Sequence, residues 1–116
     1  MANYPIEIEV ANVEANLQGV QKIFDDYQNA CFTTRTSEFF CLELNGEAGE
    51  LANLEKKEWK GKSIDFDRFA DEAADVLIAL MNYSNAKGVD LGKAVHDKLL
   101  KIEEKRSRLE KAGEKY

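Results

Sequence analysis

CLELNGEAGELANL, residues 41–54, and DEAADVLIALM, residues 71–81, each carry two acids with the same spacing. Glu47 and Glu50 are three residues apart, and so are Glu72 and Asp75. Residues three apart lie on one face of an α-helix, so each pair predicts two carboxylates side by side, where like charges repel. Small residues fill the positions between the acids, Ala48 and Gly49 in the first pair and Ala73 and Ala74 in the second, and leucines flank the pairs. The two stretches therefore predict two amphipathic helices, each with an acidic pair on one face.

Neighbouring residues do not neutralise these acids. The positions three and four residues away from Glu47, Glu50 and Asp75 hold neither Lys nor Arg. Asp75 also lies in the otherwise apolar run 73–81, which favours burial, and burying an unpaired carboxylate is costly. If the two helices face each other, four carboxylates converge, and a hard divalent cation with oxygen ligands, Mg²⁺ or Mn²⁺, satisfies them. The alternative is a solvated acidic face, or pairing with Lys and Arg of a distant helix.

Composition indicates a single helical domain spanning residues 1–116, which is long enough for a modest core. The chain has only one proline, and this scarcity of helix-breaking residues favours a few long helices over many short strands. The net charge of −6 argues against non-specific binding to duplex nucleic acid, which requires a basic surface. A small anionic substrate held through a metal ion remains compatible with this charge.

The cysteine content, the N-terminal residues and the lack of a long apolar run favour a cytoplasmic protein. Cys31 and Cys41 are too few for a disulfide framework, and reduced thiols are the simpler interpretation. The N-terminal residues lack the basic region and apolar core of a signal peptide. No apolar run approaches the roughly 18 residues that a membrane-spanning helix needs, so we expect no membrane partner.

Four helices are predicted from the period of the apolar residues and from helix-capping residues. The first follows a loosely ordered lead-in whose alternating IEIEV, residues 6–10, permits a short strand. Thr36 or Ser37 is expected to cap the second helix and Ser63 or Asp65 the third; Gly88 ends the third helix, and Asp90 caps the fourth. The predicted fold is an all-α bundle of four helices over about 12–30, 37–57, 65–87 and 91–111.

The order of these motifs resembles the MazG-like family of all-α nucleoside triphosphate pyrophosphohydrolases. Its signature is E-x-x-E followed by E-x-x-D, found here in EAGEL at 47–51 and DEAADVL at 71–77. The resemblance continues through NAKGVDL at 85–91 and AVHDKLLK at 94–101, and covers about residues 37–106. Two positions depart from the pattern: Gly46 stands where many relatives carry a further acid, and Ile102 where many carry Asn.

The resemblance implies hydrolysis of a (d)NTP to a (d)NMP and pyrophosphate, which removes unwanted nucleotides from the cellular pool. It implies Mg²⁺, or Mn²⁺, held by Glu47, Glu50, Glu72 and Asp75. It also implies a homodimer or homotetramer in which the helical bundle is completed between chains.

Several residues are candidates for roles in this reaction. Glu50 is our choice for the base that activates water. Lys98, Lys101 and Arg106, near the end of the chain, are candidates to bind the phosphates, against the alternative of a solvated helix face. Trp59 is a candidate to stack on the base, although Trp is common in packing.

Three further residues complete the candidates and their alternatives. Asn82 is a candidate to hydrogen-bond the edge of the base. His96, the only histidine, is expected to be an ordinary surface or interface residue. A di-iron carboxylate bundle requires Glu-x-x-His, and the residue three before His96 is Lys93, which excludes that motif. The alternative from another class is a non-catalytic helical module that binds metal or nucleotide and acts by interaction.

Overall fold

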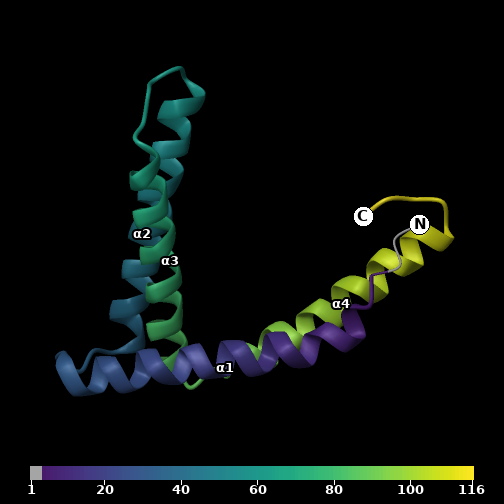
Figure 1. The fold of residues 1–116 in the computed structure, drawn as a ribbon, viewed down its shortest axis with the longest axis horizontal. Coiled ribbons are helices and arrows are strands. Elements are labelled where there is room, and N and C mark those ends of the chain that lie inside the picture. The colour runs from purple at the N-terminus through teal and green to yellow at the C-terminus, as the bar shows by residue number, and fades with distance from the viewer. Residues whose placement is uncertain (1–3) are drawn as a thin grey trace. The chain divides into compact units, whose positions relative to one another are not determined.

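The computed structural model describes residues 4–116, and within that range the protein is entirely helical. Four helices follow one another along the chain and no strand occurs among the described residues (Figure 1). The helices are α1 (Ile6–Cys31), α2 (Ser37–Trp59), α3 (Phe66–Lys87) and α4 (Leu91–Lys111). The predictions of an all-α chain and of four helices are confirmed.

Side chains at the helix ends fix these boundaries. Thr36 caps α2 by accepting a hydrogen bond from the Phe39 backbone N–H, and Asp65 caps α3 by accepting from Asp67 N–H. Gly88 ends α3 in the left-handed conformation, at φ 77°, which a residue without Cβ adopts at little cost. These caps agree with the sequence prediction and leave short connections between the helices.

The predicted start of the first helix is wrong. α1 begins at Ile6 rather than near residue 12, so the residues that permitted a strand form its first turns. Glu7 and Glu9 favour this outcome, because acidic side chains stabilise the positive end of the helix dipole. Val10, which the helical period places one turn after Ile6, is 2% exposed. The alternation of apolar and acidic residues over only five positions was therefore too short to indicate a strand. Residues 1–3 of the expected lead-in lie outside the described residues.

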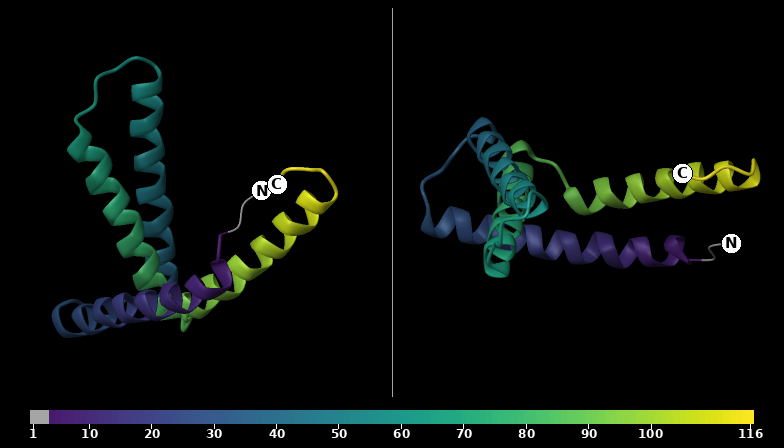
Figure 2. Two further views of the ribbon diagram at one scale, coloured as in Figure 1. Left: turned by 45° about the vertical axis from the view of Figure 1, so that its right-hand side comes forward. Right: turned by 90° about the horizontal axis from the view of Figure 1, so that it is seen from above.

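The chain divides into two compact units, one formed by Ile23–Val89 and the other by the residues up to Lys22 together with Asp90–Tyr116. In the first unit, α2 and α3 pack against each other as an antiparallel hairpin (Figure 2). Phe40 and Leu54 of α2 and Ala79 and Met81 of α3 are its buried apolar side chains.

Burial in this hairpin is one-sided. The run 73–81 was predicted to be buried, yet Leu77 and Ile78 are 46% and 44% exposed within it. A two-helix hairpin covers one face of each helix, so the apolar residues of the opposite face stay on its surface. This part of the prediction is wrong for the single chain.

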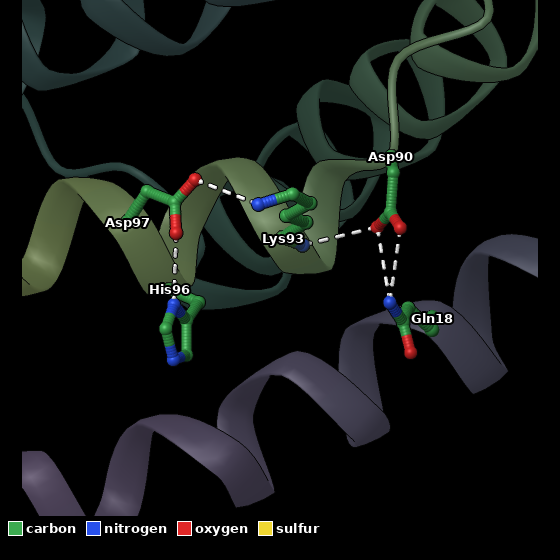
Figure 3. Close-up of polar contacts among 5 residues, drawn as sticks. All are labelled: Gln18, Asp90, Lys93, His96 and Asp97. Atoms are coloured by element: carbon green, nitrogen blue, oxygen red, sulfur yellow. Dashed lines mark hydrogen bonds and ion pairs between the residues drawn. The ribbon is translucent and has the colours of Figure 1, made fainter.

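The second unit joins the N-terminal part of α1 to α4, which lie side by side and run in opposite directions (Figure 2). Gln18 Nε2 donates to both carboxylate oxygens of Asp90, at 3.0 and 3.3 Å, while the same carboxylate caps α4 by accepting from Lys93 N–H (Figure 3). Gln21 is 8% exposed and its carbonyl oxygen accepts from Leu91 N–H at 3.0 Å. A single turn of α4 is thus held by two glutamines of α1.

Among residues 4–116 no helix combines the length and the apolar character that crossing a bilayer requires.

Candidate metal centre

Three of the four predicted acids converge where α2 faces α3. Glu47 and Glu50 come from one side of α2 and Glu72 from α3, and one carboxylate oxygen of each lies within 4.8 Å of the others. The spacing of three residues places both α2 acids on the same face, and the antiparallel pairing brings Glu72 opposite them. We call Glu47, Glu50 and Glu72 the acidic cluster.

Asp75 lies beside this cluster rather than within it. Its carboxylate groups with those of Glu72 and Asp71, again with one oxygen of each within 4.8 Å of the others. Glu72 is therefore common to both groups. Asp71 was not predicted as a ligand, although its spacing of four residues from Asp75 placed both on one helical face and was available as a signal.

Neither Lys, Arg nor any other hydrogen-bond donor of the described residues reaches the innermost oxygens. The Oε2 atoms of Glu47 and Glu72 are buried and have no hydrogen-bond partner among residues 4–116. Among residues 4–116 neither of these two side chains, nor Glu50 or Asp75, forms an ion pair with Lys or Arg. Unsatisfied buried carboxylate oxygens are costly, and a set made only of oxygen donors suits a hard divalent cation such as Mg²⁺. The residues present therefore fit the predicted metal.

The proximity of the acids changes their protonation. Partial burial, followed by hydrogen bonds with Glu47 and Glu50 and by their negative charge, raises the pKa of Glu72 to about 7. The pKa of Glu47 is also raised, first by desolvation and then by the charges of Asp75, Glu50 and Glu43. Desolvation and neighbouring negative charge both favour the protonated form of a carboxyl, and both act on these acids.

The predicted phosphate-binding residues lie on α4. Lys98 and Lys101 are exposed there. Arg106 is already held by two acids of the same helix, with contacts of 2.6 Å to Glu103 and 2.7 Å to Glu110. The hydrogen bonds from Arg106 to Glu103 hold the pKa of Glu103 below its usual range. Arg106 would have to leave both carboxylates to contact a phosphate.

The two predicted base contacts lie on opposite sides of the acidic cluster. Trp59 ends α2 and is 84% exposed, nine residues beyond Glu50, or roughly 13 Å along the helix. Asn82 is half-buried near the end of α3, seven residues beyond Asp75 in the other direction along the hairpin. One base therefore cannot touch both side chains of the same chain.

His96 lies on α4 in a short polar chain of its own. Its Nδ1 is 3.0 Å from an oxygen of Asp97, whose other oxygen accepts from Lys93 Nζ at 3.2 Å (Figure 3). This pairing agrees with the expectation of an ordinary surface histidine. Cys31 and Cys41 are both free and exposed.

Comparison with known proteins identified no relative. A scan against models of protein families, a search of curated proteins and a search of solved structures each returned no significant match.

Proposed function

We propose that this protein is a Mg²⁺-dependent nucleoside triphosphate pyrophosphohydrolase of the MazG-like type. Its reaction would be (d)NTP + H₂O to (d)NMP + pyrophosphate, serving to clear the cytoplasmic nucleotide pool. One observation supports this above the others: carboxylates of two facing helices meet, and no Lys, Arg or other hydrogen-bond donor among residues 4–116 satisfies their buried oxygens. An arrangement of this kind is unfavourable by itself and becomes favourable when a cation binds.

Glu47, Glu50 and Glu72 would hold the ion, and Asp71 and Asp75 would extend the donor set through Glu72. Bound Mg²⁺ would neutralise phosphate charge and lower the pKa of a coordinated water. The attacking water oxygen forms a bond to the α-phosphorus, the bond from that phosphorus to the bridging oxygen breaks, and pyrophosphate leaves. Glu50, the most exposed acid of the cluster, is the proposed acceptor of the water's proton.

The triphosphate carries more negative charge than a cation at the acidic cluster neutralises. Lys98 and Lys101 are the proposed phosphate ligands, because both are exposed and neither forms an ion pair among residues 4–116. Arg106 is the weaker candidate, since Glu103 and Glu110 occupy its guanidinium.

We further propose that the protein works as a homodimer or homotetramer. Leu42 of α2 is 74% exposed, and Leu77 and Ile78 of α3 remain on the hairpin surface. Large apolar side chains that stay exposed on a two-helix hairpin are typical of a helix pair that a further helix covers. A second copy of the chain would complete the helical bundle there.

The test is release of pyrophosphate from each dNTP, with and without Mg²⁺. We expect Mg²⁺-dependent release by the wild type and its loss, by a factor of at least about a hundred, in Glu50→Gln. The matched control is Glu55→Gln, an exposed acid of the same helix outside the cluster. Binding of Mg²⁺ without turnover of any nucleotide would instead identify a non-catalytic metal-binding module.

A further inference from the structure

The connector between α2 and α3, residues 60–65, carries an exposed aromatic side chain on each flank. Trp59 ends α2 and is 84% exposed, and Phe66 begins α3 and is 78% exposed. Among residues 4–116 these are the two most exposed large apolar side chains. They lie at the end of the hairpin opposite to the one where α2 begins and α3 ends (Figure 1). We call residues 56–66 the hairpin tip.

The hairpin tip is also basic. It contains four lysines against two acids, Glu58 and Asp65, which gives it a net charge of +2 in a chain whose net charge is −6. None of the lysines forms an ion pair among the described residues: Lys56, Lys57, Lys60 and Lys62. Asp65 caps α3, where the positive end of the helix dipole offsets its charge. The tip therefore attracts an anionic partner that the acidic remainder of the chain repels.

The backbone of the tip satisfies its own hydrogen-bond donors. The N–H groups of Lys60, Gly61 and Lys62 donate to carbonyl oxygens of the last turn of α2 at 3.0, 2.9 and 3.1 Å. Gly61 permits this turn because it adopts a φ of 98°, which a residue without Cβ reaches at little cost. Peptide groups that are already bonded lose no partner in a poorly hydrated environment. This turn of the connector can therefore leave bulk water together with the two rings.

Two kinds of anionic partner offer contact to exposed rings: single-stranded nucleic acid and the surface of an anionic bilayer. A nucleic-acid strand needs a basic groove beside the rings for its phosphates. The hollows that adjoin the tip on α2 and on α3, of about 470 and 350 Å³, contain more acids than cations, two to one and three to one. A bilayer is a plane that meets the end of the hairpin and leaves both hollows in water, so the charges favour the bilayer.

We propose that the hairpin tip docks on the surface of a bilayer that contains anionic lipids. Trp59 and Phe66 enter the headgroup region, where aromatic side chains with a polar edge are enriched, and the lysines face the anionic headgroups. Repulsion of the acidic remainder of the chain keeps the hairpin end-on to the surface. Such a contact needs no membrane-spanning segment, and it goes beyond the proposed nucleotide hydrolysis without depending on it.

The test uses the fluorescence of Trp59, which is the only tryptophan of the chain and therefore reports on the tip directly. Vesicles of pure phosphatidylcholine, or of phosphatidylcholine and phosphatidylserine in equal parts, are added to the full-length protein without nucleotide. We expect the emission to move to shorter wavelengths, and the protein to sediment with the vesicles, only when phosphatidylserine is present. High salt should reverse both effects, because it screens the attraction between lysines and lipids.

Removing charge from the tip should weaken this binding. Each lysine near an anionic surface raises the partition coefficient about fivefold, so Lys60→Gln together with Lys62→Gln should lower it about 25-fold. The matched control is Lys87→Gln together with Lys111→Gln, which removes the same charge from exposed positions outside the tip and should leave the partition coefficient nearly unchanged.

Removing an exposed ring tests the apolar part of the contact. Phe66→Ser should weaken sedimentation with the vesicles, because less apolar area enters the headgroup region. Ile8→Ser, at a position of α1 that is 71% exposed, is the matched control and should leave sedimentation unchanged.

Three results would overturn the proposal. The first is an emission maximum that neither kind of vesicle changes. The second is equal weakening of vesicle binding by the two double lysine variants, which would show that any surface charge suffices. The third is an emission change caused by a single-stranded oligonucleotide and not by vesicles, which would assign the tip to nucleic acid. The proposed hydrolase is tested separately by pyrophosphate release, so either proposal can fail while the other stands.

Discussion

Glu47 and Glu72 face each other from α2 and α3, and each has a buried carboxylate oxygen with no hydrogen-bond partner in the described part of the chain. Desolvation is the first cause that raises the pKa of both groups; neighbouring negative charges add to it, those of Glu50 and Glu47 at Glu72 and those of Asp75 and Glu50 at Glu47. The hairpin therefore pairs its two helices through groups that repel each other when ionised. Such a pairing lowers the stability of the metal-free protein and creates a place where a cation would restore it.

Glu72→Gln should stabilise the metal-free protein. The amide has nearly the shape of the carboxyl, carries no charge and donates hydrogen bonds to the carboxylates of Glu47 and Glu50 without needing a proton. The urea midpoint at pH 8 is expected to rise, and the further rise that Mg²⁺ gives the wild type should disappear, because a ligand stabilises only the state that binds it.

The matched control for this change is Glu55→Gln, which removes the same charge from an exposed position of α2. The rise in urea midpoint that Mg²⁺ gives to Glu55→Gln should equal the rise that it gives to the wild type. A Glu72→Gln protein that keeps the full effect of Mg²⁺ would show that the cation binds elsewhere.

The stability of the metal-free protein should fall as the pH rises through 7. Glu72 keeps its proton up to about pH 7 in the folded protein, against an ordinary value of 4.5. Between these values the folded state binds more protons than the unfolded state, so the free energy of unfolding decreases with increasing pH. Urea midpoints measured between pH 5 and 8 in the presence of a chelator would record this slope.

The slope is best measured as a difference between two proteins, because every group that binds protons differently in the folded and unfolded states contributes to it. Wild type and Glu72→Gln share all their other titratable groups, and subtracting their profiles leaves the contribution of Glu72. Parallel profiles for the two proteins would contradict the assignment of the raised pKa to Glu72.

Much of the fold could be predicted because its signals are local. The residues that set the helix ends act within a few positions of themselves. The side chains of Thr36, Asp65 and Asp90 cap the first turns of α2, α3 and α4, and Gly88 ends α3 because it adopts the left-handed conformation. The pairing of the two acidic motifs was also predictable in part, since Glu47, Glu50 and Glu72 needed only an antiparallel hairpin to meet.

Features that depend on packing between distant segments could not be predicted. Gln28 of α1, Arg35 of the following loop and Asn82 of α3 line the same two hollows, and no spacing in the sequence relates them. The hydrogen bond from Leu91 N–H to the buried side chain of Gln21 spans 70 residues, and nothing near Gln21 indicates it. The exposure of Leu77 likewise depends on which helices cover α3. The period of the apolar residues identifies an apolar face but does not identify the helix that packs on it.

Gly92→Ala should weaken the contact between α1 and α4. A Cβ at Gly92 would overlap the Glu14 carbonyl oxygen and lie 2.9 Å from Cγ of Gln18. The backbone oxygen cannot move without displacing α1, so the substitution is expected to cost about 1–3 kcal/mol, as overpacking typically does. Urea or thermal unfolding would measure the loss.

Gly19→Ala is the matched control, since it adds the same methyl group to the interior of α1. A Cβ at Gly19 meets nothing within 4 Å, so only helix propensity changes and the protein should gain about 0.5–1 kcal/mol. Equal effects of the two substitutions would show that α4 does not approach α1 closely at Gly92.

Leu77→Glu should convert the proposed oligomer into a monomer. Leu77 is 46% exposed on the hairpin, and a second copy that covers it would have to bury an unpaired carboxylate after the substitution, which is costly. Light scattering at micromolar concentration is expected to give a multiple of 13.1 kDa for the wild type and a single chain mass for the variant. Asn16→Glu adds the same charge at an exposed polar position of α1 and should leave the mass unchanged. A wild-type mass of one chain would refute the oligomer itself, whereas an undiminished mass in Leu77→Glu would move the interface to another face.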